Sequence, residues 1–135
     1  MIERIELLHK AGYVHNDLKN DNLIVGKLPR GGLGRLRIID FGTATKYQEE
    51  DGKHVAKDKE VIFKGNGLLN SWRVIRGFAP TRADDMMSIG LVMLYLIDGL
   101  PYQDTYFQMF NNHHPLRFQA LSDAKEIFTP LMYCL

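Results

Sequence analysis

The stretch DDMMSIGLVMLYLID, residues 84–98, constrains the fold more than any other part of this chain. Its charged residues lie at its two ends and its middle is apolar on nearly every side, so a helix here has little surface suited to water. Asp84 and Asp85 lie where a helix N-terminus favours negative charge. We therefore predict a buried central helix around which the other elements pack. A membrane span is the rival interpretation, but the run is shorter than the roughly 20 apolar residues that cross a bilayer.

Length and charge limit the choice of architecture and partner. Of the 135 residues 45% are hydrophobic, which is enough for one modest core and too little for two comfortable domains. Seventeen Lys and Arg against sixteen Asp and Glu give a net charge of +1, so bulk charge does not favour nucleic acid or a membrane surface as partner. Cys134 is the single cysteine, and no leader-like segment opens the chain. We expect an intracellular protein, cytoplasmic, nuclear or both.

Apolar spacing predicts the elements before the central helix. Residues 2–11 repeat apolar positions at helical intervals and end at Gly12, which is typical of an amphipathic helix. Residues 23–25 (LIV) read as a short buried strand and residues 36–39 (LRII) as a second. The glycine-rich GKLPRGGLG joins them, so we expect a hairpin. The polar segment 43–64 has no sustained period and is predicted to be a long loop.

The signals after the central helix are weaker. We expect a helix around residues 106–110 and another from Asp123, which can cap it while Glu126 reaches back. Pro130 falls inside that last helix, so either it kinks the helix or the helix starts elsewhere.

Two clusters of special residues receive ordinary interpretations. The methionines Met86, Met87 and Met93 are interpreted as core filling. The adjacent His113 and His114 have no third ligand nearby, so we do not expect a metal site there.

The segment HNDLKNDN, residues 15–22, concentrates carboxylate, amine and amide groups between two apolar runs. Transfer of a terminal phosphoryl group to a hydroxyl needs a carboxylate to accept a proton, positive charge at the transferred group, and oxygen ligands for magnesium. Asp17, Lys19 and Asn22 supply those roles in turn. Asp40, in IIDFG at the end of the second predicted strand, is the candidate for a further magnesium ligand. The hairpin brings Asn22 and Asp40 to the same end.

Each of these residues also has a plain structural interpretation. Asp17 could cap a turn, Lys19 could be solvated and Asp40 could simply end a strand. Their combination, order and spacing favour the chemical interpretation, since a single short motif often arises by chance.

The run HNDLKNDN followed by DFG resembles the catalytic loop and metal-binding motif of protein kinases, in which Lys follows the Asp by two residues and Asn follows it by five. DDMMSIG is similar to the buried central helix of that family, where Asp85 would hold the catalytic-loop backbone. The resemblance implies that His15 is structural, packs against Phe41 and bonds to the backbone. It implies a fold that is mainly α with a small β-hairpin (α+β), the large lobe of a kinase, with residues 1–135 as a partial kinase domain.

Within the kinases the chain resembles the casein kinase I family. FGTATKY is similar to the segment that follows that family's metal motif, Ser71 stands where the family has its Ser-Ile-Asn triplet, and GLPYQ is similar to the family's SLPWQ. The resemblance implies ATP and magnesium as cofactors, with Lys19, Asn22 and Asp40 binding them, and a protein serine or threonine hydroxyl as substrate. Lys19, two residues after the proposed base, favours serine/threonine over tyrosine specificity.

The chain departs from the kinase pattern at three positions. Asn16 replaces an arginine that pairs with a phosphorylated activation loop in many kinases. Asn66 replaces a threonine that bonds the catalytic Asp and Lys, and Leu68 replaces a casein kinase I arginine that binds phosphate on primed substrates. We therefore expect neither activation by loop phosphorylation nor a preference for primed substrates.

Three hypotheses for function remain open at this point. No glycine-rich strand-turn-strand, strand lysine or helix glutamate precedes the first predicted helix, so the resemblance lacks the small lobe. We expect a fragment or truncated gene model that is inactive alone and is a serine/threonine kinase in its full-length form. The second hypothesis is a pseudokinase or kinase-like binding platform, which the missing lobe and Asn16 favour. The third is a small-molecule phosphotransferase, although those usually lack the lysine and the DFG.

Overall fold

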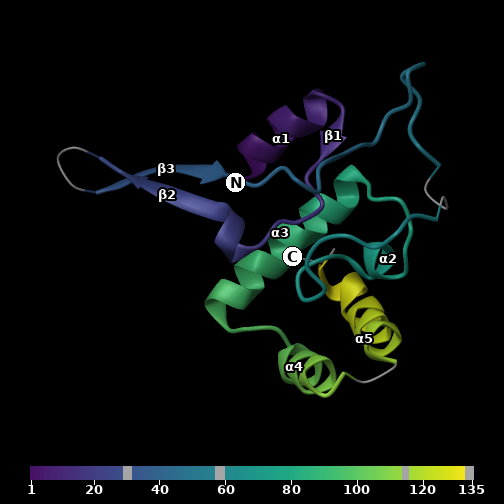
Figure 1. The fold of residues 1–135 in the computed structure, drawn as a ribbon. Coiled ribbons are helices and arrows are strands. Elements are labelled where there is room, and N and C mark those ends of the chain that lie inside the picture. The colour runs from purple at the N-terminus through teal and green to yellow at the C-terminus, as the bar shows by residue number, and fades with distance from the viewer. Residues whose placement is uncertain (29–31, 57–59, 114–115, 133–135) are drawn as a thin grey trace.

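The computed structural model describes residues 1–28, 32–56, 60–113 and 116–132 (Figure 1). Over these residues it is a mixed α+β fold with five α-helices, one short 3-10 helix and two antiparallel sheets of two strands each. The elements are α1 (Ile2–Lys10), β1 (Tyr13–Val14), η1 (Asn20–Asn22), β2 (Leu23–Lys27), β3 (Leu33–Ile38), β4 (Thr45–Lys46), α2 (Trp72–Ile75), α3 (Arg82–Ile97), α4 (Gln103–Asn111) and α5 (Arg117–Met132). The α+β class is the one that the sequence predicts.

Helix α3 runs through the middle of the molecule (Figure 1). Its buried face holds Asp84, Asp85, Ser88, Ile89, Leu91 and Val92. The prediction of a buried helix is wrong for its C-terminal half, where Met93, Leu96 and Ile97 are 52%, 65% and 79% exposed. Met86 is exposed as well, so of the three methionines only Met87 packs against the core. Apolar composition favours burial, but it does not determine how many neighbours cover each face of a helix.

Two apolar clusters hold α3 in place. The larger joins α3 to α5 and to the segments on either side of α3, through Leu68, Leu69, Ile75, Leu91, Val92, Leu100, Tyr102 and Leu121. The smaller consists of Ile5 from α1, Leu18 from the loop after β1, and Ile89 from α3. Burying such a side chain stabilises a fold by about 1.5–3 kcal/mol. Since Leu18 is 0% exposed, the smaller cluster holds that loop between α1 and α3.

The predicted hairpin is confirmed, because β2 pairs with β3 in antiparallel register, with Leu23 opposite Ile38. The prediction that residues 23–25 are buried is wrong, since Ile24 and Val25 are each 47% exposed. The hairpin extends away from the helices, so its strands have few neighbours (Figure 1). A Cβ at Gly34 would lie 2.6 Å from the carbonyl oxygen of Gly26, so the close approach of the two strands requires glycine there.

The long loop predicted for residues 43–64 contains structure that periodicity did not reveal. Within it β4 pairs with β1, and an isolated bridge joins Gln48 to His54. A two-residue strand is too short to show alternation, so only its partner identifies it. Residues 57–59 of this segment lie outside the described residues.

The C-terminal helices begin earlier than predicted. Helix α4 starts at Gln103, and α5 starts at Arg117, so Asp123 lies inside α5 and does not cap it. Asp123 and Glu126 instead accept hydrogen bonds of 2.8 and 2.7 Å from Arg76, which joins α5 to the end of α2. The alternative that the last helix starts elsewhere is therefore correct, and α5 continues through Pro130 to Met132.

Two further points concern the predictions after α3. His113 lies in the turn after α4 and is exposed, whereas His114 lies outside the described residues. No helix within the described ranges combines the length and apolarity that crossing a bilayer requires.

Candidate active site

Two loops connect the same two sheets and therefore run side by side. Residues 15–22 lead from β1 to β2, and residues 39–44 lead back from β3 to β4. The loops are hydrogen-bonded at both ends: Ile39 N–H donates to the Asn22 carbonyl at 3.0 Å, and the Thr43 hydroxyl donates to the His15 carbonyl at 3.0 Å. Pairing of the sheets thus brings the two candidate motifs together.

Asp85 of α3 holds the beginning of the loop formed by residues 15–22. Its carboxylate accepts hydrogen bonds from the backbone N–H groups of His15 and Asn16, at 2.8 and 2.9 Å. His9 Nε2 lies 2.8 Å from the same carboxylate. Asp85 is 2% exposed, so these contacts are shielded from water and correspondingly strong. They match the supporting role expected for Asp85.

The His15 side chain ties the two loops together. The backbone N–H of Asp17 donates to His15 Nδ1 at 3.3 Å, so the ring proton is assigned to Nε2, which donates to the Ile39 carbonyl at 3.2 Å. The ring also lies against Phe41, with centroids 5.2 Å apart. These are the contacts expected of a structural histidine.

Asp17, Lys19 and Asn22 are in direct contact. Asp17 Oδ2 pairs with Lys19 Nζ at 2.8 Å and accepts from Asn22 Nδ2 at 3.2 Å. Asn22 Nδ2 also donates to the Asp17 carbonyl at 2.8 Å. The hydrogen bond to Asp17 is the main factor that raises the pKa of Lys19, and the carboxylates of Asp21 and Asp40 add to it. Lys19 is therefore fully charged at neutral pH.

The second oxygen of Asp17 differs from the first. Asp17 Oδ1 is buried and has no hydrogen-bond partner among the described residues. A buried polar atom left without a partner costs about 1–3 kcal/mol. Such an atom is open to a water molecule or a bound group, and Asn20 Oδ1, Asn70 Oδ1 and Ser122 Oγ share this property.

Asp40 lies next to this group. It follows Ile39, whose N–H bonds to the Asn22 carbonyl, and its carboxylate acts on the pKa of Lys19. Asp40 has a φ of 60°, and Asn16 in the facing loop has a φ of 63°. Residues other than glycine seldom adopt this left-handed conformation, and such strain tends to occur at functional sites.

The few oxygen ligands at this site suit a magnesium ion that also binds phosphate and water better than an ion whose ligands all come from the protein. No group of three or more His, Cys, Asp or Glu side chains comes together within the described parts of the chain. Asn22 and Asp40 supply an amide and a carboxylate, and Nδ2 of Asn22 is engaged by Asp17, which leaves its Oδ1 for other contacts. Magnesium typically binds to one or two such protein groups together with phosphates and water.

A sequence model of the protein kinase domain matches residues 1–128. The match covers nearly all of the chain. The chain belongs to the protein kinase domain family. Enzymes of this family use ATP, generally with magnesium, and act on protein substrates.

Two departures from the kinase pattern have visible structural consequences. Asn66 Oδ1 accepts from the backbone N–H groups of Leu68 and Leu69, at 2.7 and 3.2 Å. It makes no hydrogen bond to Asp17 or Lys19 within the described residues, so it does not reproduce the contacts of the usual threonine. Leu68 is 7% exposed and belongs to the larger apolar cluster. It presents no group to a phosphorylated substrate.

Sequence reasoning missed two residues that support the site. Asn70 Nδ2 donates to the Asn16 carbonyl at 3.2 Å and to the Lys64 carbonyl at 3.3 Å. Lys125 of α5 is 3% exposed, and its Nζ donates to the Asn70 carbonyl. No sequence signal singles them out, because a lone asparagine in a loop and a lysine in an amphipathic helix are normally interpreted as solvated.

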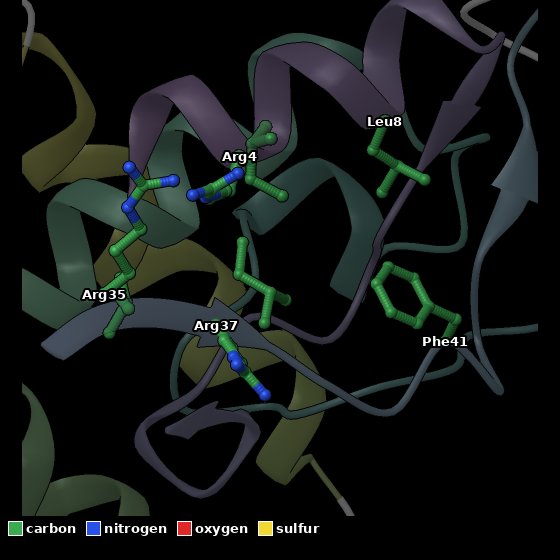
Figure 2. Close-up of a pocket in the computed structure, with 8 residues that line it drawn as sticks. Arg4, Leu8, Arg35, Arg37 and Phe41 are labelled. Atoms are coloured by element: carbon green, nitrogen blue, oxygen red, sulfur yellow. The ribbon is translucent and has the colours of Figure 1, made fainter. Parts of the chain in front are cut away.

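A pocket of about 440 Å³ opens beside Phe41 but is not the candidate site (Figure 2). Arg4 and Arg35 lie at one end of it, and Leu8 and Phe41 lie at the other. None of the four candidate site residues lines it. The four candidate residues therefore meet at the polar contacts of the two loops and do not line this pocket, which Arg4, Arg35 and Arg37 border.

Proposed function

We propose that this protein, in its full-length form, is a serine/threonine protein kinase of the casein kinase I type that transfers the terminal phosphoryl group of ATP to a protein hydroxyl. The observation that carries the proposal is the contact of Asp17 with Lys19 and Asn22, beside a buried carboxylate oxygen for which the described parts of the chain offer no hydrogen-bond partner. The casein kinase I assignment is supported by the segments FGTATKY and GLPYQ and by Ser71.

Asp17 is the proposed proton acceptor. Its Oδ2 is held by Lys19 and Asn22, which orients the carboxylate, and we assign its Oδ1, which has no hydrogen-bond partner among the described residues, to the substrate hydroxyl. Proton removal by a positioned carboxylate is the base step of phosphoryl transfer in this family. The charge of Lys19, whose pKa is raised, would stabilise negative charge on the transferred group.

Asn22 and Asp40 are the proposed magnesium ligands. When bound, magnesium would neutralise phosphate charge and orient the nucleotide. The protein's contribution is to hold the two oxygen ligands at one end of the hairpin, through the backbone bond between Ile39 and Asn22.

The decisive experiment is Asp17→Asn in the full-length protein. Asparagine keeps the shape of the side chain and cannot accept the proton, so we expect phosphoryl transfer from radiolabelled ATP to fall by about a hundredfold or more. Asp104→Asn is the matched control, since Asp104 is exposed on α4 and has no proposed role in the site. It should keep most of the activity, and circular dichroism should show both variants folded. Activity of Asp17→Asn close to that of the wild type would refute the assigned base.

A second candidate is a kinase-like binding platform without catalysis. The side chain of Asn66 favours it, because it bonds within its own turn and leaves the Asp17–Lys19 pair without a contact that active kinases have. Calorimetry of magnesium-dependent ATP binding separates the candidates. Tight binding by the full-length protein favours the kinase, whereas no binding at millimolar ATP favours the platform.

A further inference from the structure

We propose that Lys125 is a positioning residue, which holds the backbone of residues 64–71 against the catalytic loop and so sets where a protein substrate meets Asp17. This inference rests on the proposed function and names a residue outside both motifs that carry it. We call residues 64–71 the adjoining segment.

Lys125 reaches the adjoining segment with its ammonium group. Its Nζ donates to the carbonyl oxygens of Gly67, Leu68 and Asn70, at 2.8, 2.8 and 2.5 Å. It also lies 5.2 Å from the centre of the Tyr102 ring. An ammonium group has three N–H donors, so the three carbonyls match its protonated form.

These carbonyls need such a partner because the segment turns without regular secondary structure until α2 begins at Trp72. Gly67, Leu68 and Asn70 are buried, and buried backbone carbonyls are costly when unpaired. One side chain from a distant helix donates to all three, and the Tyr102 hydroxyl also donates to the Leu68 carbonyl, at 3.2 Å. The path of the segment at Gly67 and Asn70 therefore depends on Lys125.

The adjoining segment in turn contacts the catalytic loop. Asn70 Nδ2 donates to the Asn16 carbonyl. A Cβ at Gly65 would overlap that same carbonyl oxygen and would lie 2.6 Å from Asn70 Nδ2, so the two backbones touch there. Asn16 directly precedes Asp17. The adjoining segment therefore lies against the loop that carries the proposed base, on the side of Asn16.

A surface pocket lies where the adjoining segment contacts the catalytic loop. It has a volume of about 450 Å³ and is lined by Asn16, Thr45, Val61, Ile62 and Lys64, with Glu60 and Pro80. A substrate segment that approaches Asp17 from this side would contact both the catalytic loop and the adjoining segment. Lys125 would then affect binding of the protein substrate more than binding of ATP.

Burial lowers the pKa of Lys125, so its charge is costly in the folded chain. An apolar side chain of similar length would avoid that cost. The lysine is therefore explained by the carbonyls that it holds, because an apolar side chain at this position would leave them without that donor.

Amide hydrogen exchange of the 135-residue chain tests the positioning role without any assay of catalysis. In Lys125→Met we expect exchange in the adjoining segment to become about tenfold faster, while α1 and the β2–β3 hairpin exchange as in the wild type. Lys125→Gln keeps an amide that can donate to two carbonyls, so it should show a smaller increase. Lys10→Met removes an exposed helical lysine and is the matched control, with no change expected in the adjoining segment.

Unchanged exchange in the adjoining segment of both variants would overturn the proposal. So would an equal increase throughout the chain, because a purely structural lysine would lower the stability of every element together.

A kinetic test of the full-length protein completes the design. In Lys125→Met the KM for a casein substrate should rise about tenfold, while kcat and the KM for ATP change by less than about twofold. A fall in kcat with an unchanged KM for casein would contradict the proposal. Absence of phosphoryl transfer in the wild type would refute the proposed function alone, and the exchange experiment would still decide the role of Lys125.

Discussion

Replacing Asp85 should loosen the catalytic loop at its base. Its carboxylate accepts hydrogen bonds from the backbone N–H groups of His15 and Asn16 and contacts His9. His15 is 0% exposed and Asn16 is 9% exposed, so water cannot replace the lost acceptor. Asp85→Ala leaves two buried N–H groups unpaired, next to an Asn16 that already has a φ of 63°.

The expected cost follows from those contacts. A buried backbone donor left without a partner costs about 1–3 kcal/mol, so the loss of two lowers the free energy of unfolding by about 2–6 kcal/mol. That is a large part of the roughly 5–15 kcal/mol that stabilises an ordinary domain. Asp85→Asn keeps one acceptor oxygen and should lose about half as much.

Urea unfolding followed by the fluorescence of Trp72, the single tryptophan, measures these losses. The control is Asp104→Ala, which removes an exposed aspartate from the first turn of α4 and should cost about 0.5 kcal/mol or less. A loss below about 1 kcal/mol for Asp85→Ala would show that this carboxylate does not hold the loop.

Two further predictions concern the junction with the adjoining segment and the buried lysine. Gly65→Ala should lower the free energy of unfolding by about 3 kcal/mol or more, because its φ is 102° and the new Cβ would overlap the Asn16 carbonyl. The control is Gly52→Ala, which has a φ of 79° and open space around the new Cβ, and should cost only about 1 kcal/mol. Equal losses in denaturant titrations would contradict the close approach. Because burial lowers the pKa of Lys125, the unfolded chain binds that proton more tightly between the lowered pKa and the ordinary value of 10.5. The free energy of unfolding should therefore rise with pH up to about 9.5, and Lys125→Met should flatten that rise. Burial raises the pKa of Tyr102, which lowers the free energy of unfolding with pH only above about pH 10. A slope that is the same in Lys125→Met and wild type would argue against that shift.

The sequence was informative where a residue's role depends on its neighbours in the chain. Helical spacing predicted α1, and two apolar runs around a glycine-rich link predicted the β2–β3 hairpin. The order of Asp17, Lys19, Asn22 and Asp40 indicated a kinase-like site, and the kinase family match is consistent with that interpretation. The assigned roles of these residues stay predictions until the variants are measured.

Elements that depend on distant partners were not visible in the sequence. The strands β1 and β4 have two residues each and exist because they pair with one another. Helix α5 begins before its predicted start. The prediction placed the start at Asp123 because Asp123 and Glu126 look like capping residues in the sequence, but in the structure both bind Arg76. Composition was also no guide to exposure in α3, where Ile97 is 79% exposed.

The sequence by itself determined which chemical groups this protein has near its proposed site, because motif spacing is a property of the chain. How those groups are held could be predicted only in part. The kinase resemblance predicted that Asp85 holds the catalytic-loop backbone, whereas only the tertiary structure revealed Lys125, which comes from a helix far along the chain and acts on backbone atoms that any residue would supply. Every residue has a backbone carbonyl, so the type of the accepting residue does not indicate such a hydrogen bond. The sequence alone therefore could not reveal the contact made by Lys125.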